Sequence, residues 1–443
     1  MKKLVSMLLI LVLVISMVAC GKSDEGSEAS TKSEGEEKVL TVWVSMSLVS
    51  EEEQKMKQDD WYISKVAKKF EEENPGVKVE LVVVSDQSAS HQTFKAAAET
   101  NSGPDVANLW SGQSIFAMKD IIMDIKDLVP EEDYENINGW ESVTLDFKEG
   151  NPVLGYPASG QEVCGFIYNR AVLSEAGLDF DNNPPQSLEE FVEAMEQVKA
   201  IGKTPIAASD DGWNGAYFFT FASLWVQANG SERVASNSTG ETKFAEDQAF
   251  LDSYSFMNEL YSKGLINKDY LTIPSVDQFF LEGTSALLCT GNWMVNTAIE
   301  ALGEENVGFC ALPDLNDDVQ VKNTAIGGPG QCFVVSKKCK DPELAVKFCS
   351  FVDNRENHIE LLKTLSKFPI RKDISLEDIG MEGKPVFEQI AELAENYVYW
   401  ADNSMVPEIN AEMQKLGPLV ITGKMTPQEM AKKLDQKAAE LNK

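Results

Sequence analysis

LTVWV at residues 40–44 and VKVELVVV at 77–84 are apolar runs with the length of buried strands. Between them, apolar residues within 52–70 repeat at spacings of three and four, which is the pattern of a helix with one buried face. An Asn-Pro-Gly turn at 74–76 ends this pattern. A strand, a helix and a second strand in this order predict a parallel, right-handed β-α-β unit.

The alternation of strands and helices continues along the chain. The expected elements are helices at 92–100, 171–176 and 342–351, and strands at 105–110, 153–157, 165–169, 205–208, 286–289 and 332–335. Ser187 with Glu190, and Thr426 with Glu429, have the spacing of capping boxes that begin further helices. This alternation places the chain in the α/β class.

The composition excludes several classes of protein. The chain has 443 residues, with 39 Lys and Arg against 71 Asp and Glu, so the formal net charge is 39 − 71 = −32. A balance this acidic argues against binding to nucleic acid, which depends on clustered basic side chains. With only His91 and His358 in the chain, a site built from several histidines is nearly excluded.

The first twenty residues have the pattern of an export signal. Lys2 and Lys3 precede an apolar run at 4–19, which suits a signal peptide better than a membrane span. Cys20 follows this run directly, and the arrangement resembles the lipobox of bacterial lipoproteins, in which the cysteine is lipidated and becomes the N-terminus. Residues 21–38 contain almost no core-forming side chain, so we expect a flexible tether that holds the folded body at the outer face of the cell membrane.

The remaining cysteines and acidic clusters give weaker signals. Six cysteines follow Cys20 without any C-x-x-C pair, and the sequence leaves their pairing open. Asp314, Asn316 and Asp318 have the spacing of the start of a calcium loop, but the required glycine is absent. Asp179, Asp181, Asn183 and Glu190 also have calcium-like spacing, but Pro184 stands in place of that glycine. We therefore predict no metal and no cofactor.

Several stretches in fixed order resemble the extracellular solute-binding proteins of bacterial ABC importers, in particular the carbohydrate-binding family that includes maltose-binding protein. These stretches are NSGPDVANLWSGQ (101–113), GYPASGQEVCGFIYNRAVLSEAGLD (155–179), FLEGTSALLCTGNWM (280–294), VGFCALPDL (307–315), IGGPG (326–330) and TGKMTPQEMAKKLDQK (422–437). The resemblance covers almost the whole chain after the tether.

The resemblance implies a two-lobe fold of the type II periplasmic-binding-protein kind, with a ligand cleft between lobes joined by crossing segments. The crossings are then expected near 161–165, 323–327 and 366–371. Lobe one would comprise 39–162 plus 325–368, and lobe two 163–324 plus 369–443. Glycines near the first two crossings would serve as hinges.

The resemblance also suggests which residues bind the ligand. An indole face matches the C–H face of a sugar ring, and nearby amides, hydroxyls and carboxylates match its hydroxyl rim. The candidates at strand ends, at the first crossing and in loops of lobe two are Ser45, Trp110, Ser111, Gln113, Gln161, Glu162, Trp213, Trp293 and Asp402. Trp43 lies within a strand and is expected in the core.

The sequence therefore predicts a non-catalytic, lipid-anchored receptor that captures a carbohydrate and delivers it to the permease of an ABC transporter. One alternative is a secreted glycosidase, which would need two carboxylates flanking one bond. Another is the same fold with a polyamine or peptide as ligand. The identity of the sugar is not encoded in any recognisable motif.

Overall fold

The computed structural model describes residues 37–50, 52–85, 90–100, 102–210, 214–273 and 276–442, with the side chains of 214–219 left out. The predicted signal peptide, Cys20, Trp213 and nearly all of the tether lie outside the described residues. Lys38, the last residue of the predicted tether, is the first residue of a strand. Residues Lys38–Lys443 form one compact unit. Among the described helices, none combines the length and apolar character that crossing a bilayer requires.

The first sheet is built on the predicted β-α-β unit. Its strand order is β2-β1-β3-β10-β4. β1 pairs in parallel with both β2 and β3, whereas β10 is antiparallel to β3 and β4, so the predicted parallel pairing is confirmed. The strands are β1 (Lys38–Ser45), β2 (Val77–Val84), β3 (Val106–Trp110), β4 (Tyr156–Ala158) and β10 (Gln331–Val335).

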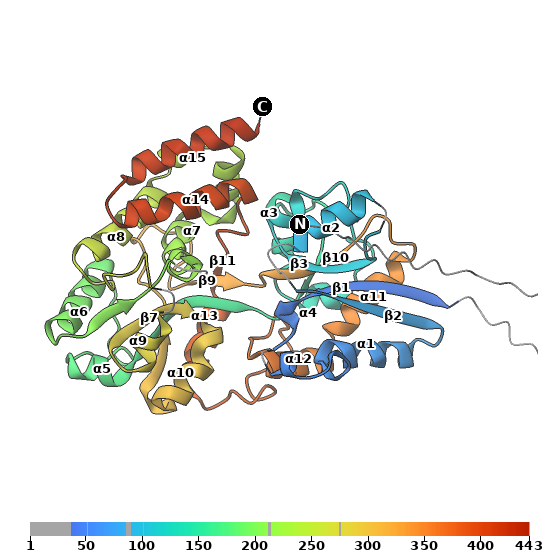
Figure 1. The fold of residues 1–443 in the computed structure, drawn as a ribbon, viewed down its shortest axis with the longest axis horizontal. Coiled ribbons are helices and arrows are strands. Elements are labelled where there is room, and N and C mark those ends of the chain that lie inside the picture. The colour runs from blue at the N-terminus through green and yellow to red at the C-terminus, as the bar shows by residue number, and fades with distance from the viewer. Residues whose placement is uncertain are drawn as a thin grey trace, which may run out of the picture. The chain divides into compact units, whose positions relative to one another are not determined.

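Helices from two separate parts of the chain, 62–136 and 342–365, cover the first sheet (Figure 1). α1 contacts β2 and also α11 and α12, and Phe70 of α1 packs edge-on against Phe348 at 5.2 Å between ring centroids. The expected helix at 52–70 begins only at residue 62, because Trp61 has extended backbone and short 3₁₀ turns precede it. The helices are α1 (Tyr62–Glu73), α2 (Ser90–Glu99), α3 (Gln113–Phe116), α4 (Glu131–Asn136), α11 (Pro342–Val352) and α12 (Arg355–Leu365).

The second sheet has the order β11-β9-β5-β7-β6, with β8 also paired to β5. β5 is its central strand: β7 lies on one side, and β9 and then β8 lie on the other. Every residue of β7 is buried. The strands are β5 (Glu162–Asn169), β6 (Thr204–Ala207), β7 (Ser285–Gly291), β8 (Val307–Cys310), β9 (Ala325–Gly328) and β11 (Tyr397–Tyr399).

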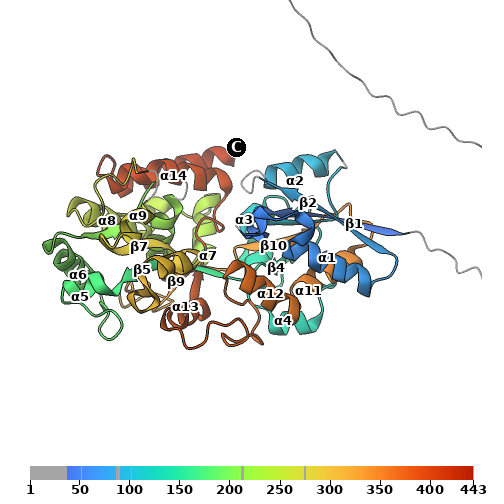
Figure 2. The same ribbon diagram turned by 60° about the horizontal axis from the view of Figure 1, so that its bottom comes forward.

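Around the second sheet, α14 packs against α8 and α15, as Figures 1 and 2 show. The capping box of Thr426 and Glu429 is confirmed at the start of α15. At α6 the prediction was only half right, because Ser187 accepts from the Glu190 N–H while the Glu190 side chain accepts from Gln186 instead. The helices are α5 (Arg170–Glu175), α6 (Leu188–Ala200), α7 (Asn214–Thr239), α8 (Gln248–Ser262), α9 (Asp277–Leu281), α10 (Val295–Leu302), α13 (Pro385–Glu395), α14 (Pro407–Ile421) and α15 (Pro427–Leu441).

The chain passes between the two sheets at short segments. It leaves β4 and enters β5 across 159–161, and it leaves β9 and enters β10 across 329–330. These passages are offset from the expected crossings at 161–165 and 323–327, because Glu162 pairs with Gly328 and extends the β5–β9 ladder of the second sheet. A third passage follows α12, as expected near 366–371. The lobe boundaries themselves stay a prediction.

The glycines near the first two expected crossings are Gly160, Gly165, Gly327 and Gly328, and two of them have positive φ angles. Gly160 and Gly328 have φ angles of 75° and 99°, which favour glycine. Gly165 and Gly327 lie inside strands, and a Cβ on Gly327 would lie 2.4 Å from the Glu162 carbonyl oxygen. These two glycines therefore permit close approach between strands, and their role as hinges stays a prediction.

Candidate functional site

A chain of hydrogen bonds ties together the ends of three strands of the first sheet. The Ser45 hydroxyl donates to Asn108 Oδ1 at 2.5 Å and lies 2.5 Å from the Ser47 hydroxyl. Ser47 in turn donates to Gln331 Oε1 at 2.6 Å. Ser45 and Asn108 are buried. The hydroxyl of Ser45 is thus engaged within the protein, and its contact with a ligand stays a prediction.

Trp110 lies at the carboxyl end of β3 and keeps part of its surface exposed. Its main-chain N–H donates to Nε2 of His91 at 3.0 Å, and the two rings lie 5.3 Å apart between centroids. Burial lowers the pKa of His91 to about 4, so the imidazole is neutral at physiological pH. Sequence reasoning missed His91, because nothing in its neighbours marks it as a partner of Trp110.

The loop after β3 connects the first sheet to the segment that follows β11. Ser111 is fully buried, and its hydroxyl donates to the Pro329 carbonyl at 3.0 Å and lies 2.5 Å from the Tyr399 hydroxyl. The Gln113 N–H donates to the Asn403 carbonyl at 2.7 Å. The neighbouring Gly112 has no room for a side chain, since a Cβ would lie 2.2 Å from the same carbonyl oxygen. Ser111 and Gln113 therefore help to join segments from the two sheets.

Asp402 lies in this joined segment, between two anchored side chains. Trp400 Nε1 donates to the Gly328 carbonyl at 3.0 Å, and Asn403 Nδ2 donates to the Gly330 carbonyl at 3.1 Å. Asp402 itself is partly exposed, but its Oδ1 is buried and has no hydrogen-bond partner among the described residues. Burial raises the pKa of Asp402 to about 6. The carboxyl group thus retains an unused acceptor beside the passages between the sheets.

Gln161 and Glu162 lie where the chain enters β5. Gln161 Nε2 donates to the Ala394 carbonyl at 3.1 Å, while its Oε1 has no partner within the described part of the chain. Glu162 lies 3.5 Å from the ammonium group of Lys367, which belongs to the third passage. Both side chains therefore contact elements that meet at the passages.

Trp293 is adjacent to this same entry into β5. Gly291 pairs with Cys164 of β5, and Asn292 Oδ1 accepts the Val163 N–H at 2.9 Å. The indole lies over Gly291, because a Cβ there would be 2.1 Å from the Trp293 ring. Trp293 is partly exposed. Each residue of the Gly-Asn-Trp sequence thus has a local role: Gly291 makes room for the Trp293 ring, and the Asn292 side chain binds the loop to β5.

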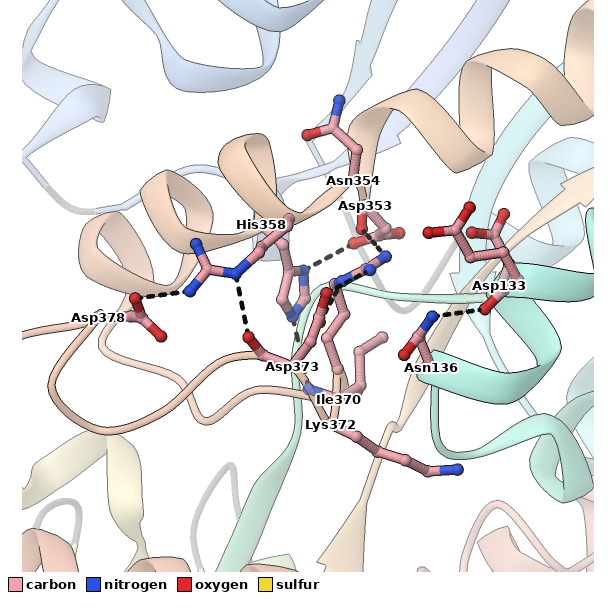
Figure 3. A network of polar contacts seen from close by, with 12 residues as sticks. Asp133, Asn136, Asp353, Asn354, His358, Ile370, Lys372, Asp373 and Asp378 are labelled. Carbon is pink, nitrogen blue, oxygen red and sulfur yellow. Dashed lines mark hydrogen bonds and ion pairs between the residues drawn. The ribbon is translucent and has the colours of Figure 1, made fainter.

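A buried polar network fixes the third passage to the first sheet's helices (Figure 3). The His358 Nε2 accepts the Ile370 N–H at 3.4 Å, so Nδ1 carries the proton donated to Asp353 at 2.9 Å. Both side chains are fully buried. Arg371 pairs with Asp373 at 2.8 Å and also donates to the Asp353 carbonyl. The second histidine of the chain is therefore structural.

The structure thus brings the predicted residues together in two groups. Ser45, Trp110, Ser111 and Gln113 lie at or after the ends of first-sheet strands, and Gln113 is bonded to the segment of Asp402. Gln161, Glu162 and Trp293 lie around the entry into β5. Trp213 is outside the described residues. Trp110 and Trp293 are both partly exposed, and their contact with a ligand stays a prediction.

Surface cavities and acidic clusters lie elsewhere. A cavity of about 480 Å³ opens between α1 and α12, and another of about 270 Å³ lies beside α5; neither is lined by a predicted ligand residue. Among the described residues, no group of His, Cys, Asp and Glu has the arrangement of a metal site. Asp181 pairs with Arg170 at 2.7 Å, and Asp314 accepts the Asn323 N–H. The six described cysteines are free thiols.

Comparison with known proteins shows the family of the chain. The family of bacterial extracellular solute-binding proteins matches residues 65–388 of the chain. The chain belongs to this family. A relative from Streptococcus mutans serotype c, named multiple sugar-binding protein, is 23% identical over 308 residues, which cover 67% of this chain and 69% of that protein.

Solved structures show the same fold. A chitin oligosaccharide binding protein superposes with a TM-score of 0.74 at 23% identity, covering 92% of this chain and all (100%) of that one. The sugar-binding protein MalE from Xanthomonas citri superposes with a TM-score of 0.70 at 16% identity, covering 91% and 97%. The α/β fold of this solute-binding protein is therefore the two-lobe type II fold expected from the sequence.

Proposed function

We propose that this solute-binding protein captures a carbohydrate between its two lobes. The observation that carries the proposal is the pair of partly exposed indoles, Trp110 and Trp293, held rigidly at the edges of different sheets. An indole face packs against the apolar face of a sugar, while amide and carboxyl groups bind its hydroxyls. The sugar-binding relatives support this ligand class.

Unused acceptors near the passages supply the polar half of such a site. Asp402 Oδ1 and Gln161 Oε1 have no protein partner among the described residues, and a buried polar atom without a partner costs free energy. Sugar hydroxyls that reach these oxygens on closure would recover that cost. Because only a closed arrangement lets both lobes touch one ligand, ligand binding would favour closure.

The proposal includes delivery and anchoring. We infer that the ligand-bound form docks on the permease of an ABC importer, and that lipidated Cys20 anchors the chain to the outer face of the cell membrane. Membership of the extracellular solute-binding family supports export. The lysines, apolar run and cysteine at residues 2–20 support lipidation.

Titration of the protein with a panel of mono- and oligosaccharides tests the proposal, using isothermal calorimetry together with tryptophan fluorescence. We expect saturable, one-to-one binding of at least one neutral sugar, and loss of binding in Trp110→Ala and Trp293→Ala. Trp140→Ala is the matched control, since Trp140 packs on Tyr134 and on Tyr156 of β4. A folded protein that binds no sugar in a broad panel would contradict the proposal.

A cationic ligand such as a polyamine is the second candidate. The carboxyl group of Asp402 favours a cationic ligand. Burial raises its pKa, and no positively charged side chain contributes to the shift, so an ammonium group of the ligand would be its first cationic partner. The same titrations with spermidine and putrescine discriminate the two ligands. A reducing-sugar assay on the same samples separates a receptor, which gives stoichiometric binding, from a glycosidase, which gives turnover.

A further inference from the structure

The N–H of Trp110 lies on the edge of β3 that pairs with β1, but beyond the last residue of β3 that β1 pairs with. β1 pairs with β3 only at Val106 and Ala107. The Ser111 N–H donates to Gly330, on the β10 side. Successive N–H groups of a strand point to opposite edges, so the Trp110 N–H faces away from β10. It needs an acceptor from outside the sheet.

His91 of α2 supplies that acceptor. Its Nε2 lies 3.0 Å from the Trp110 nitrogen, and its Nδ1 lies 3.4 Å from the Ser90 hydroxyl. Nε2 also lies 3.4 Å from the Trp110 carbonyl oxygen, so the tautomer of neutral His91 decides which main-chain group it bonds. The shorter distance to the nitrogen favours an unprotonated Nε2 that accepts the N–H, with the proton on Nδ1. The ring also lies against the indole, tilted by 41°. One side chain therefore fixes both the main chain and the ring of Trp110.

We propose that His91 is a positioning residue for ligand binding: it holds Trp110 in the orientation that presents the indole to the ligand. The inference rests on the proposed function, because it assigns His91 a role only through Trp110. His91 itself need not touch the ligand. Protonation of Nε2 would break its bond with the Trp110 N–H and leave Nε2 to donate to the Trp110 carbonyl instead.

Among the described residues, no charged side chain shifts the pKa of His91, whether from α2 or from β3. Burial is the main cause that lowers its pKa, to about 4, and the Trp110 carbonyl oxygen, which a protonated Nε2 can reach at 3.4 Å, opposes it. The bond with the Trp110 N–H should therefore persist down to about pH 5 and be lost below about pH 4.

NMR of the unliganded protein labelled with ¹⁵N-histidine and ¹⁵N-tryptophan tests the geometry without any ligand. We expect His91 to have a bare Nε2 and a protonated Nδ1 at pH 7, and the Trp110 amide to shift with the His91 titration. His358, with the same tautomer in a fully buried setting, is the internal reference. A protonated Nε2 on neutral His91 would overturn the proposal, even if sugar binding is confirmed.

A double-mutant cycle tests the role in binding. We expect His91→Ala to weaken the affinity for the best sugar of the panel by about 3- to 10-fold, the size of one lost hydrogen bond. His91→Gln, whose Oε1 can accept the same N–H, should restore most of it. In a Trp110→Ala background, His91→Ala should have no further effect on any residual binding. An equal loss of affinity in both backgrounds would refute a role of His91 through Trp110. If the protein shows the expected NMR shifts but binds no sugar, only the proposal of a carbohydrate ligand is refuted.

Discussion

Replacing Asp402 with asparagine should stabilise the protein at neutral pH and weaken its binding to ligand. The native pKa of Asp402 is raised from 3.8 to about 6 by burial, so the folded state binds the proton more tightly than the unfolded state. Between these two pH values, stability falls as pH rises. At pH 7 and above, the ionised carboxylate imposes its full cost on the folded state, and asparagine removes that cost.

The magnitude follows from the difference of about two pH units between the two pKa values. Each unit corresponds to about 1.4 kcal/mol, which gives an upper limit of about 3 kcal/mol. Because Asp402 is partly exposed, solvent screening reduces the expected gain to about 1–2 kcal/mol. For a chain of this length, such a gain raises Tm by about 1–2 °C.

Thermal unfolding at pH 7.5 and at pH 4, with Asp120→Asn as an exposed control, measures the effect. We expect Asp402→Asn to raise Tm at pH 7.5 and to leave it nearly unchanged at pH 4, where the wild-type carboxyl is already protonated. Asp120→Asn should change neither value. A lower Tm for Asp402→Asn at pH 7.5, or an equal rise at both pH values, would refute the argument that the carboxylate of Asp402 is desolvated and has no positively charged partner.

Further predictions concern single side chains. Gly291→Ala should displace the Trp293 indole, since its Cβ would lie 2.1 Å from the ring; we expect a shifted tryptophan emission and a loss of affinity of at least about tenfold, which is the size of about 1.4 kcal/mol. Gly177→Ala is the control for replacing a glycine, because a Cβ at Gly177 would have no neighbour within 4 Å. The positive φ of Gly177 means that this replacement costs some stability. Ser111→Ala removes the hydroxyl that bonds Pro329 and Tyr399, and should lower the free energy of unfolding by about 1–3 kcal/mol in denaturant titrations; an unchanged value would show that the bond contributes nothing. Cys20→Ser should move the protein from the membrane fraction to the medium, and continued membrane association would argue against a lipid anchor.

The fold was predictable because its elements are locally encoded. The runs at 40–44 and 77–84 are strands of one parallel pair, and the Pro-Gly turn between them ends α1 as expected. The boundaries that failed have tertiary causes. Residues 52–60 have helical composition but form short 3₁₀ turns, in which Glu53 accepts the Tyr62 N–H and fixes the start of α1. Such a contact across nine positions does not have the three-residue spacing of a capping box, so no sequence pattern marks it.

The candidate site was predictable only in part. The Gly-Asn-Trp sequence at 291–293 marks a ring laid over a glycine, and its position beside β5 follows from strand pairing. His91 could not be foreseen, because its contact with Trp110 depends on how α2 packs against β3. Likewise, the bonds of Ser111 to Tyr399 join residues separated by 288 positions.

The predicted ligand residues differ in whether their polar groups already form hydrogen bonds within the protein. Ser45 and Ser111 are buried, and each hydroxyl already donates its one hydrogen within the protein, so neither can donate to a sugar without first giving up that bond. Asp402 Oδ1 has no such partner among the described residues. Because exchanging one hydrogen bond for another gains little, the affinity for a ligand should come from the indoles and from Asp402. The two serines instead hold the strand ends and the joined segment in place.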